Sequence, residues 1–571
     1  ENGANSSFIN QYLSNEIPVS DLSFNPAAKI QEQLDQKNLS NLPLPCEIYL
    51  PRQNSNGLDF SEPEFINSIA KHLEVLEKNR ITALAITSLE LGSTDKSDIL
   101  SLCDESNIGV VHWSDPDSIH HSSFQISTEW MNASFDQRAA VLNDVANSLD
   151  SQSWQFIYLL MHEAGKTIQD AHDEIREAVD FLRYYANRST LFNSQSTQSG
   201  PTGEDNILEY CPKGLVACIS PWNFPLAITL GQIAAALVTG NTVIAKASEE
   251  TSLIAFKAAG LFFNHGLPKD ALHLLLGDGR VGQAIITSQA LDLVVFTGSL
   301  KTAKSIHNSL SNKPGKIVPL IAETGGLNSM VVDSSALIER ACDDIMRSAF
   351  NSAGQRCSAL RLLLVHETIY EELILMLKGM MSELIIGNPS NSSVDMGPII
   401  SVEAAQELYD YINRSDPERL AIFQPQAPDE HRKQWFLPTL IELKSINTLN
   451  EEKFGPILHV LKFSEKTLDS QLEQITAKGF GLTFGIHTRI DAKAIHASKL
   501  VSAGNTYINR DIIGAVVESQ PFGGKNLSGT GFKAGGPNYL MQFTDERTIS
   551  INTVAIGGNA ELLNQASEDA P

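Results

Sequence analysis

The chain has 571 residues, of which 42% are hydrophobic, and a formal net charge of −25 at neutral pH. This composition excludes a disordered chain, because there are enough apolar residues to form several cores. The acidic balance argues against nucleic-acid binding, which needs a basic surface.

The cysteines, histidines and apolar stretches also narrow the class of protein. Six cysteines show no pairing pattern and no Cys-x-x-Cys, so we expect a reducing compartment, the cytoplasm. The histidines form no ligand-spaced cluster, so no metal is expected. The most apolar stretch, residues 226–245, contains Thr229, Gln232 and Asn241, which favours a buried helix and strand over a membrane span.

The first 120 residues or so predict a connector with mixed helical and strand pieces. Residues 41–63 are rich in proline and asparagine, which favours loops. Residues 134–137 (SFDQ) then have the pattern of a capping box, and an apolar stripe at helical spacing follows in Leu142, Val145, Ala146 and Leu149. Two long helices are therefore expected to lead into the next domain.

Between residues 214 and 322, short apolar runs alternate with helical segments, which predicts a doubly wound parallel sheet. The first run, 214–220, is followed by residues 221–225 (PWNFP). Their two prolines fix a turn at the carboxyl end of a strand, where such sheets bind ligands. Asn223 could there donate a hydrogen bond to an oxyanion.

One motif in this region is interpreted as a turn. Residues 277–282 (GDGRVG) match the dinucleotide-binding fingerprint, but the acidic residue expected about 20 positions later is not clearly placed. These glycines are therefore not predicted to hold phosphate.

Two side chains further along have the pattern of a nucleophile and its base. Glu323 ends the apolar run 316–322 and precedes two glycines, and Cys357 lies in residues 351–358 (NSAGQRCS). A helix N-terminus and the neighbouring Arg356 are expected to favour the thiolate, and a carboxylate at Glu323 can activate water. Most cysteines in a long chain are packing residues, so this hypothesis rests on the whole set of motifs.

The order of these motifs resembles the aldehyde dehydrogenase family. The matching segments are 221–225 (PWNFP), 246–249 (KASE), 296–299 (FTGS), 323–326 (ETGG) with Cys357, 452–456 (EKFGP) and 521–524 (PFGG). The resemblance implies an α/β fold with a doubly wound NAD-binding domain, an α/β catalytic domain and a β-hairpin oligomerisation flap.

The resemblance also implies roles for single residues. Cys357 would attack an aldehyde, its backbone N–H and the Asn223 amide would hold the oxyanion, and Glu323 would activate the water that hydrolyses the thioester. The implied NAD contacts are Trp222, Lys246, Ser248, Glu249, Gly298, Ser299, Glu452 and Phe454. A carboxylate at Glu249 would repel a 2′-phosphate, which favours NAD over NADP. Lys453, where the family has a smaller apolar residue, is expected to point to solvent.

Residues 509–522 and 528–539 resemble one branch specifically, the L-glutamate γ-semialdehyde dehydrogenase module of bifunctional proline utilization A proteins. In that branch the implied reaction is NAD-dependent oxidation to L-glutamate, the second step of proline catabolism. The implied substrate contacts are the backbone N–H groups of Gly514 and Ala515, the Ser358 hydroxyl, and the rings of Phe224 and Phe522. Three alternatives stay open: a flexible loop at residues 514–515, a dehydrogenase for another semialdehyde such as succinate semialdehyde, and a catalytically silent structural or binding module.

The same resemblance implies a domain plan. Residues 1–15 would end a preceding proline dehydrogenase domain of the same polypeptide, which alone would hold FAD. The further expected segments are a connector (16–120), the NAD-binding domain (121–322) with a flap (194–213), the catalytic domain (323–527), and an oligomerisation strand and tail (541–571). The flap would pair with residues 544–553, and we expect a homodimer.

Overall fold

The computed structural model describes residues 80–192, 196–427 and 432–555, together with 45–58, residue 60 and three single positions before residue 45. Contacts divide the chain into two units, residues 1–56 and 57–571. In the first unit a 3₁₀ turn, η1 (Pro45–Glu47), is followed by Arg52, whose guanidinium lies over the ring of Tyr49. The predicted end of a preceding domain, residues 1–15, lies outside the described residues. All elements below belong to the second unit.

A five-stranded parallel sheet confirms the predicted doubly wound arrangement. Its strand order is β10-β9-β6-β7-β8. The strands are β6 (Leu215–Ile219), β7 (Thr242–Lys246), β8 (Leu272–Leu275), β9 (Leu293–Gly298) and β10 (Leu320–Thr324). The helices between them are α10 (Ala227–Val238), α11 (Ser252–Asn264), α12 (Gly279–Ser288) and α13 (Leu300–Asn312). The chain runs outward from β6 to β8 and then returns to β9, so the order reverses between β6 and β9. Ligands of such sheets bind at this reversal.

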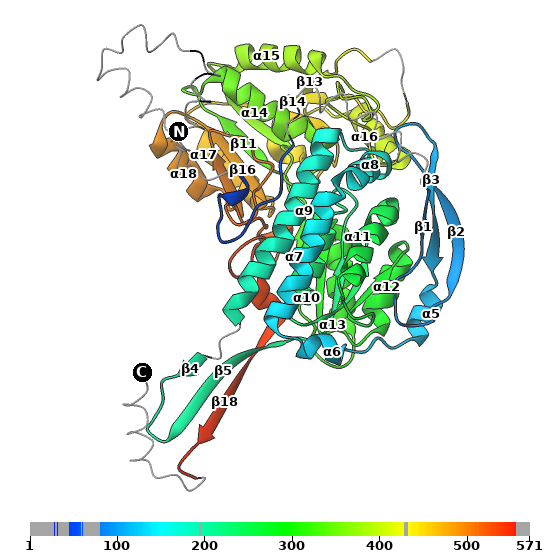
Figure 1. The fold of residues 1–571 in the computed structure, drawn as a ribbon. Coiled ribbons are helices and arrows are strands. Elements are labelled where there is room, and N and C mark those ends of the chain that lie inside the picture. Colours follow the sequence, from blue (N-terminus) through cyan, green and yellow to red (C-terminus); the bar gives the residue numbers. More distant parts are fainter. Residues whose placement is uncertain are drawn as a thin grey trace. The chain divides into compact units, whose positions relative to one another are not determined.

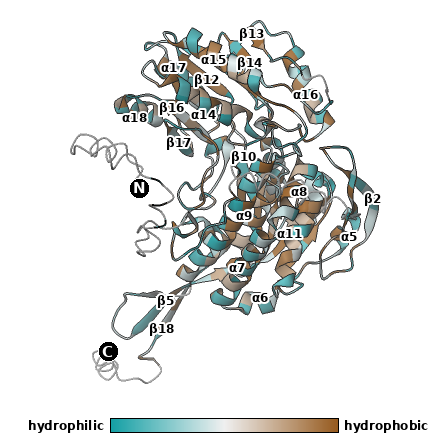
Figure 2. Cartoon of the chain, turned by 45° about the horizontal axis from the view of Figure 1, so that its top comes forward, coloured by the Kyte–Doolittle hydropathy of each residue, from teal (hydrophilic) through white to brown (hydrophobic). Residues whose placement is uncertain are grey.

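Three helices, rather than the expected two, lead into this sheet: α7 (Phe135–Ser151), α8 (Ser153–Ala164) and α9 (Ile168–Arg188). The capping box at Ser134 and Gln137 is present, and the whole predicted apolar stripe of α7 is buried. Gln152 interrupts the helical geometry after α7, and Gly165 ends α8 with φ of 67°. Hydrophilic and hydrophobic residues lie side by side on α7 and α9 (Figure 2), as expected for helices that bury one face.

A seven-stranded sheet forms the second half, in the order β13-β14-β15-β12-β11-β16-β17. All neighbours are parallel except β13 and β14. The strands are β11 (Ser329–Val332), β12 (Leu362–His366), β13 (Arg419–Phe423), β14 (Thr439–Leu443), β15 (Ile457–Phe463), β16 (Thr483–His487) and β17 (Asn505–Ile508). Its helices are α14 (Ile338–Phe350), α15 (Tyr370–Glu383), α16 (Val402–Asn413), α17 (Leu468–Ala477) and α18 (Asp491–Leu500). Its 3₁₀ turns include η4 (Asn351–Gly354) and η5 (Ile446–Thr448).

The region predicted as a connector contains regular structure. Strands β1 (Ile81–Ala83), β2 (Ser93–Leu100) and β3 (Asn107–Ser114) form a mixed sheet in the order β1-β3-β2. Two short helices, α5 (Pro116–His121) and α6 (Thr128–Asn132), follow them. Strand β2 is polar and mostly exposed (STDKSDIL), whereas β3 is more apolar and partly buried (NIGVVHWS), so the sequence predicted strand pieces here without their bounds.

The predicted hairpin and its partner strand are also present. Strand β18 (Thr544–Asn552) pairs antiparallel with β5 (Glu204–Pro212), and β5 pairs with β4 (Ser196–Gln198). Figure 1 shows β5 and β18 extending away from the sheets and helices of the unit. No helix in the described parts of the chain is both long and apolar enough to span a membrane.

Candidate active site

The predicted site residues come from opposite edges of the two sheets. Asn223 follows β6, and Glu323 lies near the carboxyl end of β10. Cys357 instead precedes β12, and Glu452 precedes β15, so the second sheet contributes its amino edge. Parallel sheets usually bind ligands at carboxyl edges, and only the first sheet follows that rule here.

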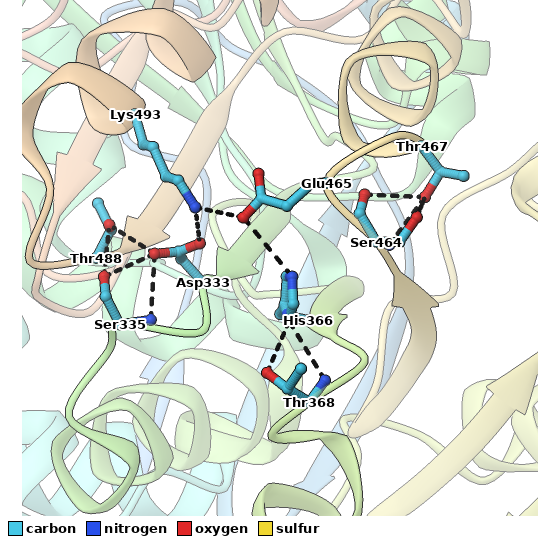
Figure 3. Close-up of polar contacts among 9 residues, drawn as sticks. All are labelled: Asp333, Ser335, His366, Thr368, Ser464, Glu465, Thr467, Thr488 and Lys493. Carbon is cyan, nitrogen blue, oxygen red and sulfur yellow. Dashed lines mark hydrogen bonds and ion pairs between the residues drawn. The ribbon is translucent and has the colours of Figure 1, made fainter.

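The carboxyl edge of the second sheet is closed by its own side chains (Figure 3). Lys493 Nζ lies 2.7 Å from the carboxylate of Asp333, which follows β11, and 2.5 Å from that of Glu465, which follows β15. His366 Nε2, at the end of β12, lies 3.7 Å from Glu465. Lys493 pairs with both carboxylates, so the edge that a general rule would choose for a ligand carries an internal polar network.

Cys357 lies in a turn after η4 and not at the helix N-terminus that the sequence predicted. Three successive residues before it have left-handed backbones: Ser352 (φ 52°), Ala353 (φ 53°) and Gly354 (φ 64°). This conformation is unfavourable for residues with a Cβ, so the surrounding structure must hold it. Asn328 helps to hold the turn, because its side-chain amide donates a hydrogen bond to the carbonyl of Cys357 at 2.7 Å.

A second anchor of the turn is an ion pair that the sequence did not reveal. Arg356 Nη2 lies 3.0 Å from the carboxylate of Asp170, in the first turn of α9. Arg356 Nε and the other Asp170 oxygen both bind the Ser352 hydroxyl, at 3.0 and 2.9 Å. Asp170 and Arg356 are both buried. The pair joins positions 186 apart in sequence, which no local pattern could have predicted.

One cavity of about 110 Å³ brings together the predicted catalytic pair and the predicted substrate contacts. Its lining includes Cys357, Glu323, Ser358, Gly514, Ala515, Phe224 and Phe522. Gly514 has φ of 65°, and nothing lies within 4 Å of the place that a Cβ would take. Glu177 of α9, which the sequence analysis did not single out, also lines the cavity, and burial raises its pKa to about 7.

The protonation state of the Cys357 thiol differs from the one that the sequence predicted. Burial raises its pKa to about 12, and the carboxylates of Glu452, Glu323 and Glu177 add to the shift. The guanidinium of Arg356 is bound to Asp170 and does not reverse the shift. The free protein therefore holds a protonated thiol, and the predicted preference for thiolate is wrong for this state.

Glu323 is a buried carboxyl with a raised pKa. One oxygen accepts a hydrogen bond from the backbone N–H of Gly524 at 3.0 Å. Burial raises its pKa to about 8, while that hydrogen bond and the charge of Lys533 act in the opposite direction. A base with a pKa near the working pH is suited to proton transfer.

Asn223 is fixed beside the nucleophile turn. It is buried, and its side-chain amide donates to the carbonyl of Gln355 at 3.1 Å. One of its two N–H groups is used in that bond, so the other can serve an oxyanion. Asn223 and Trp222 line a small neighbouring cavity with Lys166 and Gln355, and not the one that Cys357 and Glu323 share.

The groups at the carboxyl edge of the first sheet fit a dinucleotide. Lys246, at the end of β7, is buried and its Nζ lies 3.1 Å from Glu249. The Ser299 side chain accepts the N–H of Thr302 and caps α13, whose N-terminal amides suit a pyrophosphate. Gly298 ends β9 directly before this cap.

The remaining predicted cofactor residues lie at the amino edge of the second sheet. Glu452 pairs with Arg361 at 3.0 Å, and a Cβ on Gly325 would fall 1.7 Å from its carboxylate, so glycine there leaves room for Glu452. Phe454 contacts Trp222 edge to face, with ring centres 5.6 Å apart. These groups join the two sheets at the reversal point.

The structure also places Ser248, Lys453 and the glycines of residues 277–282. Ser248 donates to Glu250 at 2.5 Å. Lys453 Nζ lies over the ring of Tyr411, 4.8 Å from its centre, so the expectation that it points to solvent is wrong. The glycines of residues 277–282 follow β8, and the side chain of Asp278 caps α12. No group of three or more His, Cys, Asp or Glu side chains suited to a metal occurs within the described ranges.

A doubly wound sheet, a second and mostly parallel sheet, and a cysteine and glutamate facing one cavity together define the class of α/β proteins typified by aldehyde dehydrogenases. The chain belongs to the aldehyde dehydrogenase family, whose sequence model matches residues 106–549. Membership implies a nicotinamide dinucleotide cofactor, NAD or NADP.

Several relatives refine this assignment. The bifunctional protein PutA of Klebsiella aerogenes is 39% identical over 568 residues, which cover 96% of this chain and 42% of that protein. The 1-pyrroline-5-carboxylate dehydrogenase 1 of Halalkalibacterium halodurans is 33% identical over 74% of this chain and 82% of that protein. A crystal structure of a bifunctional proline utilization A protein superposes with a TM-score of 0.83 at 42% identity, covering 98% of this chain and 54% of the other. The chain therefore spans about half the length, or less, of these bifunctional relatives.

Proposed function

We propose that the protein oxidises L-glutamate γ-semialdehyde, formed when 1-pyrroline-5-carboxylate hydrolyses, to L-glutamate, with NAD as the oxidant. One observation carries the proposal: Cys357 and Glu323 line a single cavity together with the backbone segment 514–515 and the rings of Phe224 and Phe522. The printed names of the relatives, PutA and 1-pyrroline-5-carboxylate dehydrogenase, support the same substrate.

The chemistry begins at Cys357. Its sulfur attacks the aldehyde carbon after the thiol gives its proton to the Glu323 carboxylate, which passes it to solvent. The negative charge that forms on oxygen is held by the free N–H of Asn223 and the backbone N–H of Cys357. The nicotinamide, when bound, supplies a hydride acceptor. The thioester left on Cys357 is hydrolysed by water, whose proton Glu323 accepts.

Substrate recognition follows from the charges of an amino acid aldehyde. The α-carboxylate fits the backbone N–H groups of Gly514 and Ala515 and the hydroxyl of Ser358, which bind an anion without a cationic side chain. The α-ammonium fits the carboxylate of Glu177. Phe224 and Phe522 would hold the aliphatic chain between them.

The cofactor preference follows from Glu249. Its carboxylate, paired with Lys246, suits the hydroxyls of an adenosine ribose and would repel a 2′-phosphate, which favours NAD. We extend the proposal to a homodimer formed through β5 and β18, to the cytoplasm, and to a proline dehydrogenase domain, with its FAD, in the same polypeptide.

The test compares NADH formation with L-glutamate γ-semialdehyde and with succinate semialdehyde, in the wild type and in Cys357→Ala. We expect selectivity for the first aldehyde and complete loss in the variant. Ser358→Ala should raise the KM for the glutamate aldehyde about tenfold, because it removes one hydrogen bond to a charged group, and should leave the KM for uncharged propanal unchanged. Preference for succinate semialdehyde would refute the substrate assignment and keep the nucleophile.

A further inference from the structure

One polar atom in the catalytic cavity has no partner. Gln232 lies on α10 and lines the cavity. The residue is only 3% exposed, and its side-chain Oε1 accepts no hydrogen bond. Among the residues described as lining this cavity, no other buried side-chain atom lacks a partner. A buried carbonyl oxygen normally accepts a hydrogen bond, from protein or from water, so this one calls for a donor.

The nitrogen of the Gln232 side-chain amide fixes the position of the whole amide group. Gln232 Nε2 donates to the hydroxyl of Thr297 at 3.0 Å. Thr297 of β9 is the direct register partner of Glu323 in β10. Register partners on parallel strands lie about 4.8 Å apart and point to the same face of the sheet. The amide is therefore held beside the carboxyl of Glu323, in the cavity that also contains Cys357.

We propose that Oε1 of Gln232 binds the water that hydrolyses the thioester on Cys357, and so orients it between the Glu323 carboxylate and the thioester carbon. The inference rests on the function proposed above. Neither aldehyde attack nor hydride loss needs this water, so Gln232 serves only the second half of the reaction.

Hydrolysis of the thioester moves one proton through Glu323 and returns it to Cys357. Water gives one proton to the Glu323 carboxylate and donates its other O–H to Gln232 Oε1, while its oxygen forms a bond to the thioester carbon. The carbon–sulfur bond breaks, and its electron pair goes to Sγ of Cys357. The proton on Glu323 then neutralises the thiolate, which leaves a carboxylic acid and the free thiol.

The decisive variant is Gln232→Met, which keeps the length of the side chain and removes the oxygen. With L-glutamate γ-semialdehyde and NAD in a rapid-mixing experiment, we expect a first turnover at the wild-type rate. Steady-state NADH formation should then fall about tenfold, the effect of one hydrogen bond lost from the transition state. A burst of NADH close to one per site would separate the two halves of the reaction.

Two further variants complete the test. Thr297→Val removes the acceptor that holds Gln232 Nε2 and should give the same burst with slower turnover, which keeps the test available if Gln232→Met does not fold. Gln471→Met makes the same change on α17, at a glutamine whose buried Oε1 also lacks a partner but which does not line the cavity, and should behave as wild type.

Failure of the role of Gln232 and failure of the proposed function would give different kinetic results. Unchanged steady-state turnover in Gln232→Met, or an equal loss in its first turnover, would overturn the role of Gln232 and leave the proposed function standing. If the wild type forms no NADH from this aldehyde, the proposed function and this inference both fail.

Discussion

The resting thiol of Cys357 is set by the carboxylates around it. Because burial and Glu452 raise its pKa to about 12, alkylation by iodoacetamide in the free protein should speed up with pH without levelling off below about pH 10. Glu452→Gln removes the carboxylate with the largest effect and should speed alkylation at a fixed pH. Mass spectrometry of the Cys357 peptide measures both rates.

A matched control for this change is Glu371→Gln, which removes an exposed carboxylate paired with Lys462 on the surface. It should leave the alkylation rate of Cys357 unchanged. A rate that levels off near pH 8 in the wild type would contradict the protonated resting state.

The carboxyl of Glu323 predicts a pH dependence of turnover. Burial raises its pKa to about 8, and it acts as a base only when ionised. Where hydrolysis limits the rate, kcat should therefore rise with pH and level off above about pH 8. A kcat that stays constant from about pH 6 to 9, measured with saturating substrates, would exclude Glu323 as the limiting base.

The raised pKa of Glu323 also makes stability depend on pH, in the opposite direction to kcat. The folded state retains the Glu323 proton up to about pH 8, whereas the unfolded chain releases it near the ordinary glutamate pKa of 4.5. The unfolding free energy contributed by this group therefore falls as pH rises between these two values. Glu323→Gln cannot ionise, so its Tm relative to wild type should increase over that window.

The Asp170–Arg356 pair joins helix α9 to the turn that carries Cys357. Both side chains are buried, at 3% and 7% exposure, so removing one leaves an uncompensated buried charge, a loss of about 3–5 kcal/mol in typical cases. Arg356→Met should therefore lower the unfolding free energy by an amount of that order, measured by urea denaturation.

The double variant Asp170→Leu/Arg356→Met tests the pairing itself. It removes both charges, so it should be more stable than Arg356→Met alone, and its stability loss should be less than the sum of the two single losses. Additive losses would show that the two residues act independently. Slower alkylation or acylation in a folded single variant would further indicate that the pair holds the left-handed turn at Ser352.

The sequence predicted the parts of this molecule that local patterns encode. Alternating apolar runs located β6, β7 and β9, and the capping pattern located the start of α7. Family motifs located Cys357 and Glu323, which the structure places in one cavity. The Asp170–Arg356 pair and the Gln232–Thr297 bond could not be predicted, because each depends on contacts between elements far apart in the chain. The protonation of Cys357 also depends on carboxylates that only folding brings near.

The sequence analysis predicted that β18 takes part in oligomerisation, and this strand is largely exposed in the structure. It lies at the end of the β18-β5-β4 sheet, so one row of its backbone groups faces no strand within the described residues. Exposed strand edges readily pair with another chain. Most β18 side chains are also exposed, including Ile551 at 41%. These features favour a dimer formed through β5 and β18.

Ile551→Lys tests this dimer without breaking the hairpin. Ile551 is opposite Asp205 of β5, so a lysine there gains a favourable cross-strand partner while it places a charge in the proposed interface. We expect the protein to shift from dimer to monomer in sedimentation velocity, with an unchanged Tm for the monomeric unit. Leu375→Lys, at an apolar residue of α15 that is 75% exposed, should leave the dimer intact. If both variants dimerise like the wild type, the interface lies elsewhere on the surface, because a buried lysine charge would destabilise association through β18.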